Sequence, residues 1–135
     1  MTGPERYDAF TLMLRFRSDQ AALGDALTLF VEREDYGFVW LAYDGDTCVG
    51  CCSIAYAIAT DAGGVTAVLR DLYVLPEVRR QGVARTMLAA LHKRLDDLGI
   101  RRVDALVAAV GPGIIAFLDA CGYAATDEMT FSLGR

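Results

Sequence analysis

Residues 69–98 read LRDLYVLPEVRRQGVARTMLAALHKRLDDL, and the rest of the chain is organised around this stretch. The β-rich run at residues 69–74 predicts a strand, and Pro76 ends it because proline has no N–H group to donate to a sheet. Gly82 then opens a predicted helix in which apolar residues recur at intervals of three and four. The stretch therefore predicts a strand, a basic loop and an amphipathic helix.

The loop at residues 79–84 combines several features that favour a bound anion. Gly82 lets the backbone bend and lets a ligand approach the main chain. The first turn of the next helix exposes N–H groups that have no helical partner, at the positive end of the helix dipole. Arg79, Arg80 and Arg85 add positive charge. The loop predicts a pyrophosphate site, and the simpler alternative is a basic helix start in contact with water only.

The glycines of this loop do not fit the Walker A motif or the dinucleotide fingerprint, because both need further glycines at fixed spacing. The loop resembles motif A of the GNAT superfamily of acyl-CoA N-acyltransferases, which is Arg/Gln-x-x-Gly-x-Gly/Ala after a strand ending in Leu-x-Val. Residues 72–74 (Leu-Tyr-Val) and 79–84 match it with the usual gap. Residues 115–123 resemble the family's late motif, with Gly122-Tyr123 in place of Gly-Phe. The resemblance runs from about Phe38 to Leu133.

This resemblance implies an α/β (α+β) fold with a mixed, mostly antiparallel central sheet, flanking helices and one parallel strand-helix-strand crossover. The hydrophobic patterns agree, and they predict strands at residues 10–16, 38–43, 47–59, 65–74, 102–110 and 128–133. They predict helices at about residues 19–33, 83–98 and 114–120, the first with Ser18 as its N-cap. Only one helix is expected before the sheet, where the family commonly has two.

Composition sets limits on the class of protein. The chain has 135 residues, 54% of them apolar, and a net charge of -5, which predicts a single domain over residues 1–135. The acidic balance argues against nucleic-acid binding and suits a cationic small substrate. A turn at residues 61–64 interrupts the one segment apolar enough for a membrane span, and no signal peptide is recognised, so a cytoplasmic protein is expected.

The four cysteines are Cys48, Cys51, Cys52 and Cys121, and they are expected to be reduced thiols packed as small apolar groups. No metal is expected because a zinc site needs more histidine or cysteine ligands, and the only histidine, His92, falls off the apolar stripe of its helix. A homodimer is a further expectation, since residues 38–59 carry more apolar side chains than one face of a small sheet needs.

The resemblance implies acetyl-CoA as co-substrate, held mainly by backbone groups. The main chain around Tyr73 and Val74 would pair with the pantetheine arm and polarise the acetyl carbonyl, and the N–H groups of residues 80–85 would hold the pyrophosphate. The expected coenzyme-binding residues are Leu72, Tyr73, Val74, Arg79, Arg80, Gln81, Gly82, Val83, Ala84 and Arg85.

Asp71 is the candidate catalytic residue, as the base that receives a proton from the acceptor amine. Strand alternation places it on the face opposite Leu72 and Val74, and the resemblance implies a carboxylate that meets the amine. The alternative is a structural pair with one of three arginines, Arg70, Arg101 or Arg102. The family's proton-donating tyrosine is replaced by Leu118, and the weaker hydroxyl candidates are Tyr36, Tyr56 and Tyr73.

The sequence therefore predicts an acetyl-CoA-dependent N-acetyltransferase that acts on a small cationic amine such as a polyamine or an aminoglycoside. One alternative is an acetyltransferase for protein lysines or N-terminal amines. Another is a catalytically weakened acyl-CoA-binding or interaction domain, which the loss of tyrosine at Leu118 favours.

Overall fold

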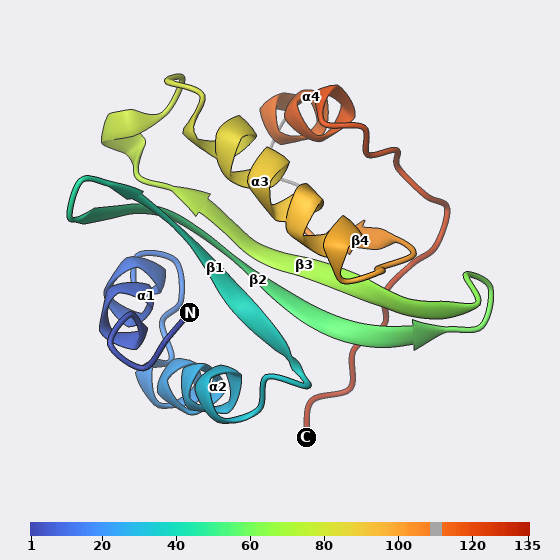
Figure 1. Cartoon of the computed structure of the whole chain (residues 1–135), viewed down its shortest axis with the longest axis horizontal. Helices are drawn as coiled ribbons and strands as arrows, with labels where there is room; N and C mark the ends of the chain where they lie inside the picture. Colours follow the sequence, from blue (N-terminus) through green and yellow to red (C-terminus); the bar gives the residue numbers. More distant parts are fainter. Residues whose placement is uncertain (109–111) are drawn as a thin grey trace.

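A computed structural model describes residues 1–108 and 112–135, and it arranges the chain as one sheet between two pairs of helices (Figure 1). The elements are α1 (Arg6–Met13), α2 (Gln20–Glu32), β1 (Gly37–Asp44), β2 (Thr47–Ala59), β3 (Gly64–Val74), the 3-10 turn η1 (Pro76–Val78), α3 (Val83–Asp97), β4 (Val103–Ala105) and α4 (Pro112–Ala120). Helices α1 and α2 cover one face of the sheet, and α3 and α4 cover the other.

The sheet has the order β1-β2-β3-β4. The pairs β1–β2 and β2–β3 are antiparallel and are joined by tight turns, whereas β3–β4 is parallel and needs α3 as its crossover. This confirms the predicted mixed, mostly antiparallel sheet with one parallel strand-helix-strand unit. The strand predicted at residues 102–110 is correct in place but wrong in length, because β4 ends at Ala105 and residues 109–110 lie outside the described ranges.

The parallel pair β3–β4 is short, so the carboxyl end of β3 extends beyond it. Only Ala67, Val68 and Leu69 pair with β4, and the Leu106 N–H donates to the Leu69 carbonyl at 2.9 Å. Strand β3 continues to Val74 with β2 as its neighbour. In the described part of the chain, no strand pairs with residues 70–74 on the β4 side. Among residues 1–108 and 112–135, the carboxyl end of β3 therefore has no paired strand along this edge of its main chain.

Apolar packing on each face of the sheet holds the helices in place. Leu12, Leu23 and Leu27 of α1 and α2 pack with Val39 of β1. On the opposite face, α3 packs on β2 and β3. Leu88, Leu91 and Leu95 of the helix contact a buried cluster that includes Cys52 and Ile54 of β2 and Leu69 of β3. Each fully buried leucine stabilises the fold by about 1.5–3 kcal/mol. The stripe on α3 thus fixes the loop before it relative to the end of β3.

The strand predicted at residues 10–16 is wrong, since residues 10–13 belong to α1. The buried residues of α1 are Ala9, Leu12 and Met13, which follow helical spacing of three and four. An apolar residue at every second position also places some apolar residues three or four apart, so the sequence pattern fits both a strand and a helix. Packing of the apolar side chains against α2 stabilises the helix. Two helices therefore precede the sheet, not one, and Asp19 rather than Ser18 caps α2, its Oδ1 accepting from the Ala22 N–H at 3.0 Å.

The strand predicted at residues 128–133 is also wrong, because this segment has no regular structure. Met129, Phe131 and Leu133 keep the alternation but are 77%, 87% and 81% exposed. An alternating pattern forms a strand only where a sheet edge supplies hydrogen bonds. The neighbouring edge strand, β4, is only three residues long.

Candidate coenzyme and acceptor site

The loop between η1 and α3 is shaped by backbone conformations that side chains rarely adopt. Gly82 caps α3 with φ of 78°, in the left-handed region, and Arg80 has φ of 66°. No side chain caps the helix, and the Gly82 carbonyl accepts from the Thr86 N–H at 3.0 Å. Among the residues that the structure describes, the first N–H groups of α3 therefore have no helical or capping partner, and such groups can bind an anion.

A cavity of about 330 Å³ brings this loop together with the open end of β3. It is lined by Val74, Val78, Arg79, Arg80, Gly82, Val83, Ala84, Arg85 and Phe117. Seven of the ten expected coenzyme-binding residues are in this set. Sequence reasoning missed Phe117, which α4 places here and which only its position in the late motif could have indicated.

The other three expected residues lie around this cavity. The Leu72 side chain packs in the apolar cluster under α3, and that of Tyr73 packs on the opposite face, 4.9 Å from the Phe16 ring between centroids. Both contribute main chain to the open edge of β3. Gln81 lines a second cavity. The side chains of Leu72 and Tyr73 thus pack on opposite faces of the sheet, and their main chain lies at the end of β3.

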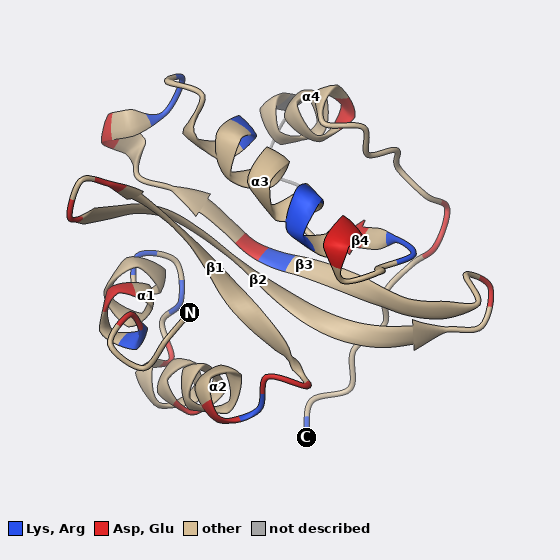
Figure 2. Ribbon diagram, in the orientation of Figure 1, with Lys and Arg blue, Asp and Glu red and all other residues tan. Residues whose placement is uncertain are grey.

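The loop arginines differ in what they contact. Arg79 turns back toward the strand, where its Nε donates to the Val74 carbonyl at 2.9 Å and its guanidinium lies 5.4 Å from the Tyr73 ring centroid. Arg80 and Arg85 are exposed, and no ion pair involves either of them among the described residues. Figure 2 shows the basic character of this loop. Arg80 and Arg85 are the cations available to an anion at the α3 terminus.

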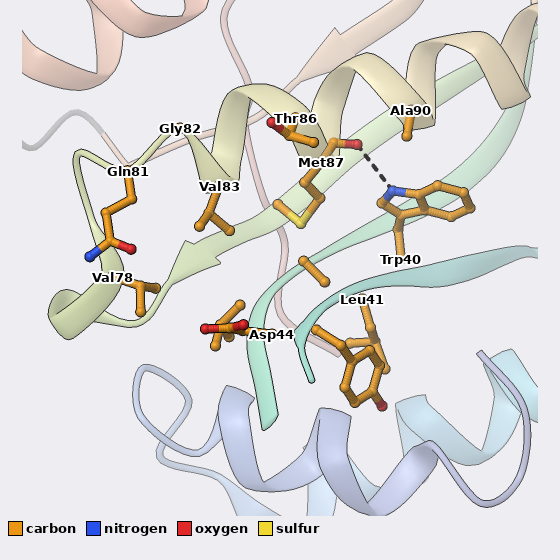
Figure 3. A pocket seen from close by; sticks show the side chains of 13 residues that line it. Trp40, Leu41, Asp44, Val78, Gln81, Gly82, Val83, Thr86, Met87 and Ala90 are labelled. Atoms are coloured by element: carbon orange, nitrogen blue, oxygen red, sulfur yellow. Dashed lines mark hydrogen bonds between the residues drawn. The ribbon is translucent and has the colours of Figure 1, made fainter. Parts of the chain in front are cut away.

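The second cavity, of about 500 Å³, lies on the other side of the loop between α3 and the β1–β2 hairpin (Figure 3). Trp40, Val49 and Met87 give it an apolar wall, and the Trp40 Nε1–H donates to the Met87 carbonyl at 3.1 Å. Val78, Gly82 and Val83 line both cavities. The loop therefore separates two hollows on the α3 side of the sheet.

Asp71 lies at an irregularity of β3. The register against β2 shifts so that Ser53 faces Arg70 and Cys51 faces Tyr73, and Asp71 has φ of 58°. Leu69 and Leu72 both pack toward α3, three residues apart, which strict alternation forbids. The bulge resets the alternation and leaves Asp71 on the face of Ser53 and α1–α2, opposite Leu72.

Both carboxylate oxygens of Asp71 are engaged. The Ser53 hydroxyl donates to Oδ2 at 2.7 Å, and Arg17 donates to Oδ1 from Nε at 3.0 Å and forms an ion pair through Nη2. The Asp71 side chain is 17% exposed. The expected alternative, a pair with Arg70, Arg101 or Arg102, is wrong, since the partner is Arg17 from the α1–α2 connection, and Arg102 pairs with Asp61 and Asp104.

Leu118 stands at the position of the family's tyrosine, and the hydroxyl side chains that line the second cavity are Tyr43 and Thr86. Tyr36, Tyr56 and Tyr73 line neither cavity. The Tyr123 hydroxyl is 2.6 Å from His92 Nε2, and burial raises the pKa of Tyr123 to about 12. His92, which falls off the apolar stripe of α3, is half-buried in this contact.

The His92 contact makes stability depend on pH. Burial lowers the pKa of His92 from 6.5, with Asp96 acting in the opposite direction, so the folded chain favours the neutral ring. Its contribution is present above the ordinary pKa and is lost as the pH falls through the lower folded pKa. Between about pH 7 and 5, we expect the free energy of unfolding to fall more for the wild type than for His92→Gln, measured by urea denaturation. Equal losses in both proteins would contradict this.

The cysteines form no disulfide in the structure. Cys51 and Cys52 are buried as expected, and burial raises the pKa of Cys52 to about 12. Among residues 1–108 and 112–135, no group of three or more His, Cys, Asp or Glu side chains could hold a metal ion. None of the helices in these ranges has both the length and the apolar character needed to span a bilayer.

Comparison with known proteins agrees with this architecture. The structure of AAC(6')-Iy in complex with the bisubstrate analog CoA-S-monomethyl-acetylneamine superposes with a TM-score of 0.85 at 16% identity, covering 100% of this chain and 95% of that chain. The aminoglycoside 6'-N-acetyltransferase AAC(6')-IG from Acinetobacter haemolyticus gives 0.82 at 17% identity, with coverage of 100% and 95%. The integron cassette protein HFX_CASS3 from the mobile metagenome of Cole Harbour Salt Marsh gives 0.84 at 19% identity, with coverage of 97% and 85%. At these identities the likeness shows the fold.

No curated protein sequence matches the chain. The sequence model of the acetyltransferase (GNAT) family matches residues 6–123, which include the open end of β3, the loop and α4. The chain therefore belongs to the GNAT family of acetyltransferases.

Proposed function

We propose that the protein is an acetyl-CoA-dependent N-acetyltransferase that moves an acetyl group to the primary amine of a small cationic acceptor. The observation that carries this proposal is the cavity joining the open edge of β3 to the uncapped α3 terminus. The uncapped N–H groups, with Arg80 and Arg85, supply donors and positive charge for a pyrophosphate. The open strand edge supplies backbone partners for the amide groups of a pantetheine arm.

In the proposed reaction, the neutral amine attacks the thioester carbonyl, an N–C bond forms and the C–S bond breaks. Asp71, directly or through water, accepts the proton that the ammonium loses before the attack. The nitrogen of the adduct then loses a second proton to solvent, and the CoA thiolate takes a proton from solvent. Backbone N–H groups at the open end of β3 would stabilise the oxyanion. Holding both reactants at the strand end accounts for much of the rate, since positioning replaces a bimolecular encounter.

Three observations support the preference for a small cationic acceptor. The chain has a net charge of -5, and the candidate base is a carboxylate that already binds a cation. Two of the solved structures with this fold are aminoglycoside acetyltransferases. From the sequence we also keep the proposals of a single domain over residues 1–135, a cytoplasmic location and a homodimer.

A second candidate is an acyl-CoA-binding domain with little turnover, which Leu118 favours because it cannot protonate a thiolate. Calorimetric titration with acetyl-CoA tests what the two candidates share, and one-site binding is expected. Release of free CoA thiol in the presence of spermidine, an aminoglycoside or a lysine peptide then separates them. Binding without thiol release from any amine would favour the second candidate, and no binding at millimolar acetyl-CoA would overturn both.

A further inference from the structure

The guanidinium of Arg17 covers the carboxylate that the proposed reaction needs. It reaches Asp71 from the connection between α1 and α2, 54 residues earlier in the sequence. Nε and Nη2 of Arg17 both contact Oδ1, whereas Oδ2 accepts only from Ser53. Since Ser53 is 5% exposed, Oδ2 points into the sheet, and Oδ1 is the oxygen that a ligand could reach.

We propose that Arg17 is a specificity-determining residue, whose guanidinium occupies the acceptor's cation subsite and is displaced when a cationic acceptor binds. This inference rests on the proposed function and adds to it the group that the acceptor must replace. Asp71 exchanges one cation for another, so its charge stays compensated. A neutral acceptor offers no such exchange and must leave either the carboxylate unpaired or Arg17 in place.

Displacement of Arg17 is energetically accessible. Its side chain is 52% exposed, so it can turn into water and keep its hydration there. The main contact that its side chain would leave, apart from Asp71, is the Phe16 ring, 5.4 Å from the guanidinium. Phe16 itself stays packed on Tyr73, so the α1–α2 connection does not depend on the ion pair. The side chain of Arg17 can therefore move without unfolding the segment that carries it.

Asp71, unlike Arg17, is held in place, so its carboxylate stays fixed when the guanidinium moves away. Its backbone lies in the bulge of β3 with φ of 58°, and its carbonyl accepts from the Cys51 thiol at 3.4 Å. Ser53 holds Oδ2. A fixed carboxylate and a movable guanidinium give the arrangement expected of a subsite that is covered in the absence of acceptor.

The test compares Arg17→Ala and Arg17→Lys with the control Arg15→Ala. Arg15 is a matched control because it is 49% exposed on the same connection and pairs with Glu77, not Asp71. We expect Arg17→Ala to lower KM for spermidine about fivefold, equivalent to about 1 kcal/mol, with kcat within about twofold. The KM of Arg17→Lys for spermidine should lie between those of Arg17→Ala and the wild type, and the KM of Arg15→Ala should equal that of the wild type. Thermal melts verify that each variant folds.

The discrimination between acceptors gives a second readout. Arg17→Ala should maintain or increase the preference for spermidine over an aromatic amine that is uncharged at neutral pH, because only the cation can pair with the carboxylate that Arg17 leaves. A lower kcat with unchanged or higher KM would overturn the proposal and make Arg17 a fixed positioning residue for Asp71.

Failure of the proposed function is distinguishable from failure of this inference. If the wild type releases no thiol with any amine, the proposed function is wrong. Direct titration with spermidine then tests separately whether Arg17 covers a cation subsite. Tighter spermidine binding by Arg17→Ala than by the wild type and Arg15→Ala would support the covered subsite. Equal binding by the three proteins would overturn it.

Discussion

Replacing Gly82 by alanine is expected to weaken acetyl-CoA binding at least about tenfold. Gly82 has φ of 78° at the start of α3, a conformation that costs an L-residue about 1–2 kcal/mol. Its position is open, with no atom within 4 Å of an added Cβ, so the effect comes from the backbone and not from a clash. The loop would relax toward negative φ and turn the N–H groups of the α3 terminus away from the cavity.

Calorimetric titration with acetyl-CoA measures this effect, and Gly63→Ala is its matched control. Gly63 has φ of 72° in the β2–β3 turn and also has no atom within 4 Å of an added Cβ. The two variants should lose similar free energy of unfolding, but only Gly82→Ala should lose affinity. Wild-type affinity in Gly82→Ala would mean that the loop does not hold the coenzyme.

Replacing Asp71 by asparagine is expected to lower kcat for amine acetylation at least about tenfold, and by up to the factor of about 10²–10⁴ that a general base contributes. Asparagine has nearly the same size, tolerates the left-handed conformation found here and can still accept a hydrogen bond from Ser53. It cannot take a proton from the acceptor, and it removes the charge that pairs with Arg17.

Steady-state thiol release gives kcat and KM for this variant, and titration with acetyl-CoA is the control for an intact coenzyme cavity. Coenzyme affinity should stay at the wild-type value, because Asp71 does not line that cavity. Unchanged turnover of Asp71→Asn across the pH range would remove Asp71 from the mechanism and leave water as the proton acceptor.

Local patterns predicted most of the central elements. Strands β1, β2 and β3 and helix α3 follow the sequence expectations within a few residues, because each has a sustained period and a turn signal at its end. The α3 stripe is buried at Met87, Leu88, Leu91 and Leu95. Gly99 follows the helix with φ of 74°, the left-handed conformation expected of a C-terminal glycine.

The errors fall at the two ends of the chain, where the patterns are short. Residues 10–16 and 128–133 alternate, but the first run contributes to a helix and the second has no strand to pair with. A strand depends on hydrogen bonds to residues that are distant in sequence. Alternation of apolar and polar residues indicates that one face of a strand could be buried, but it does not show that a neighbouring strand is available for pairing.

The sequence by itself determined the strand-loop-helix unit at residues 69–98, the parallel crossover and the location of the basic loop at residues 79–84, because these depend on residues close together in the chain. Only the tertiary structure decided the shortness of β4, the bulge at Asp71 and the partner of its carboxylate. Pairing across the β2–β3 ladder sets the bulge. Packing of α1 and α2 on the sheet brings Arg17 to Asp71 across 54 residues, and no local pattern encodes a contact of that separation.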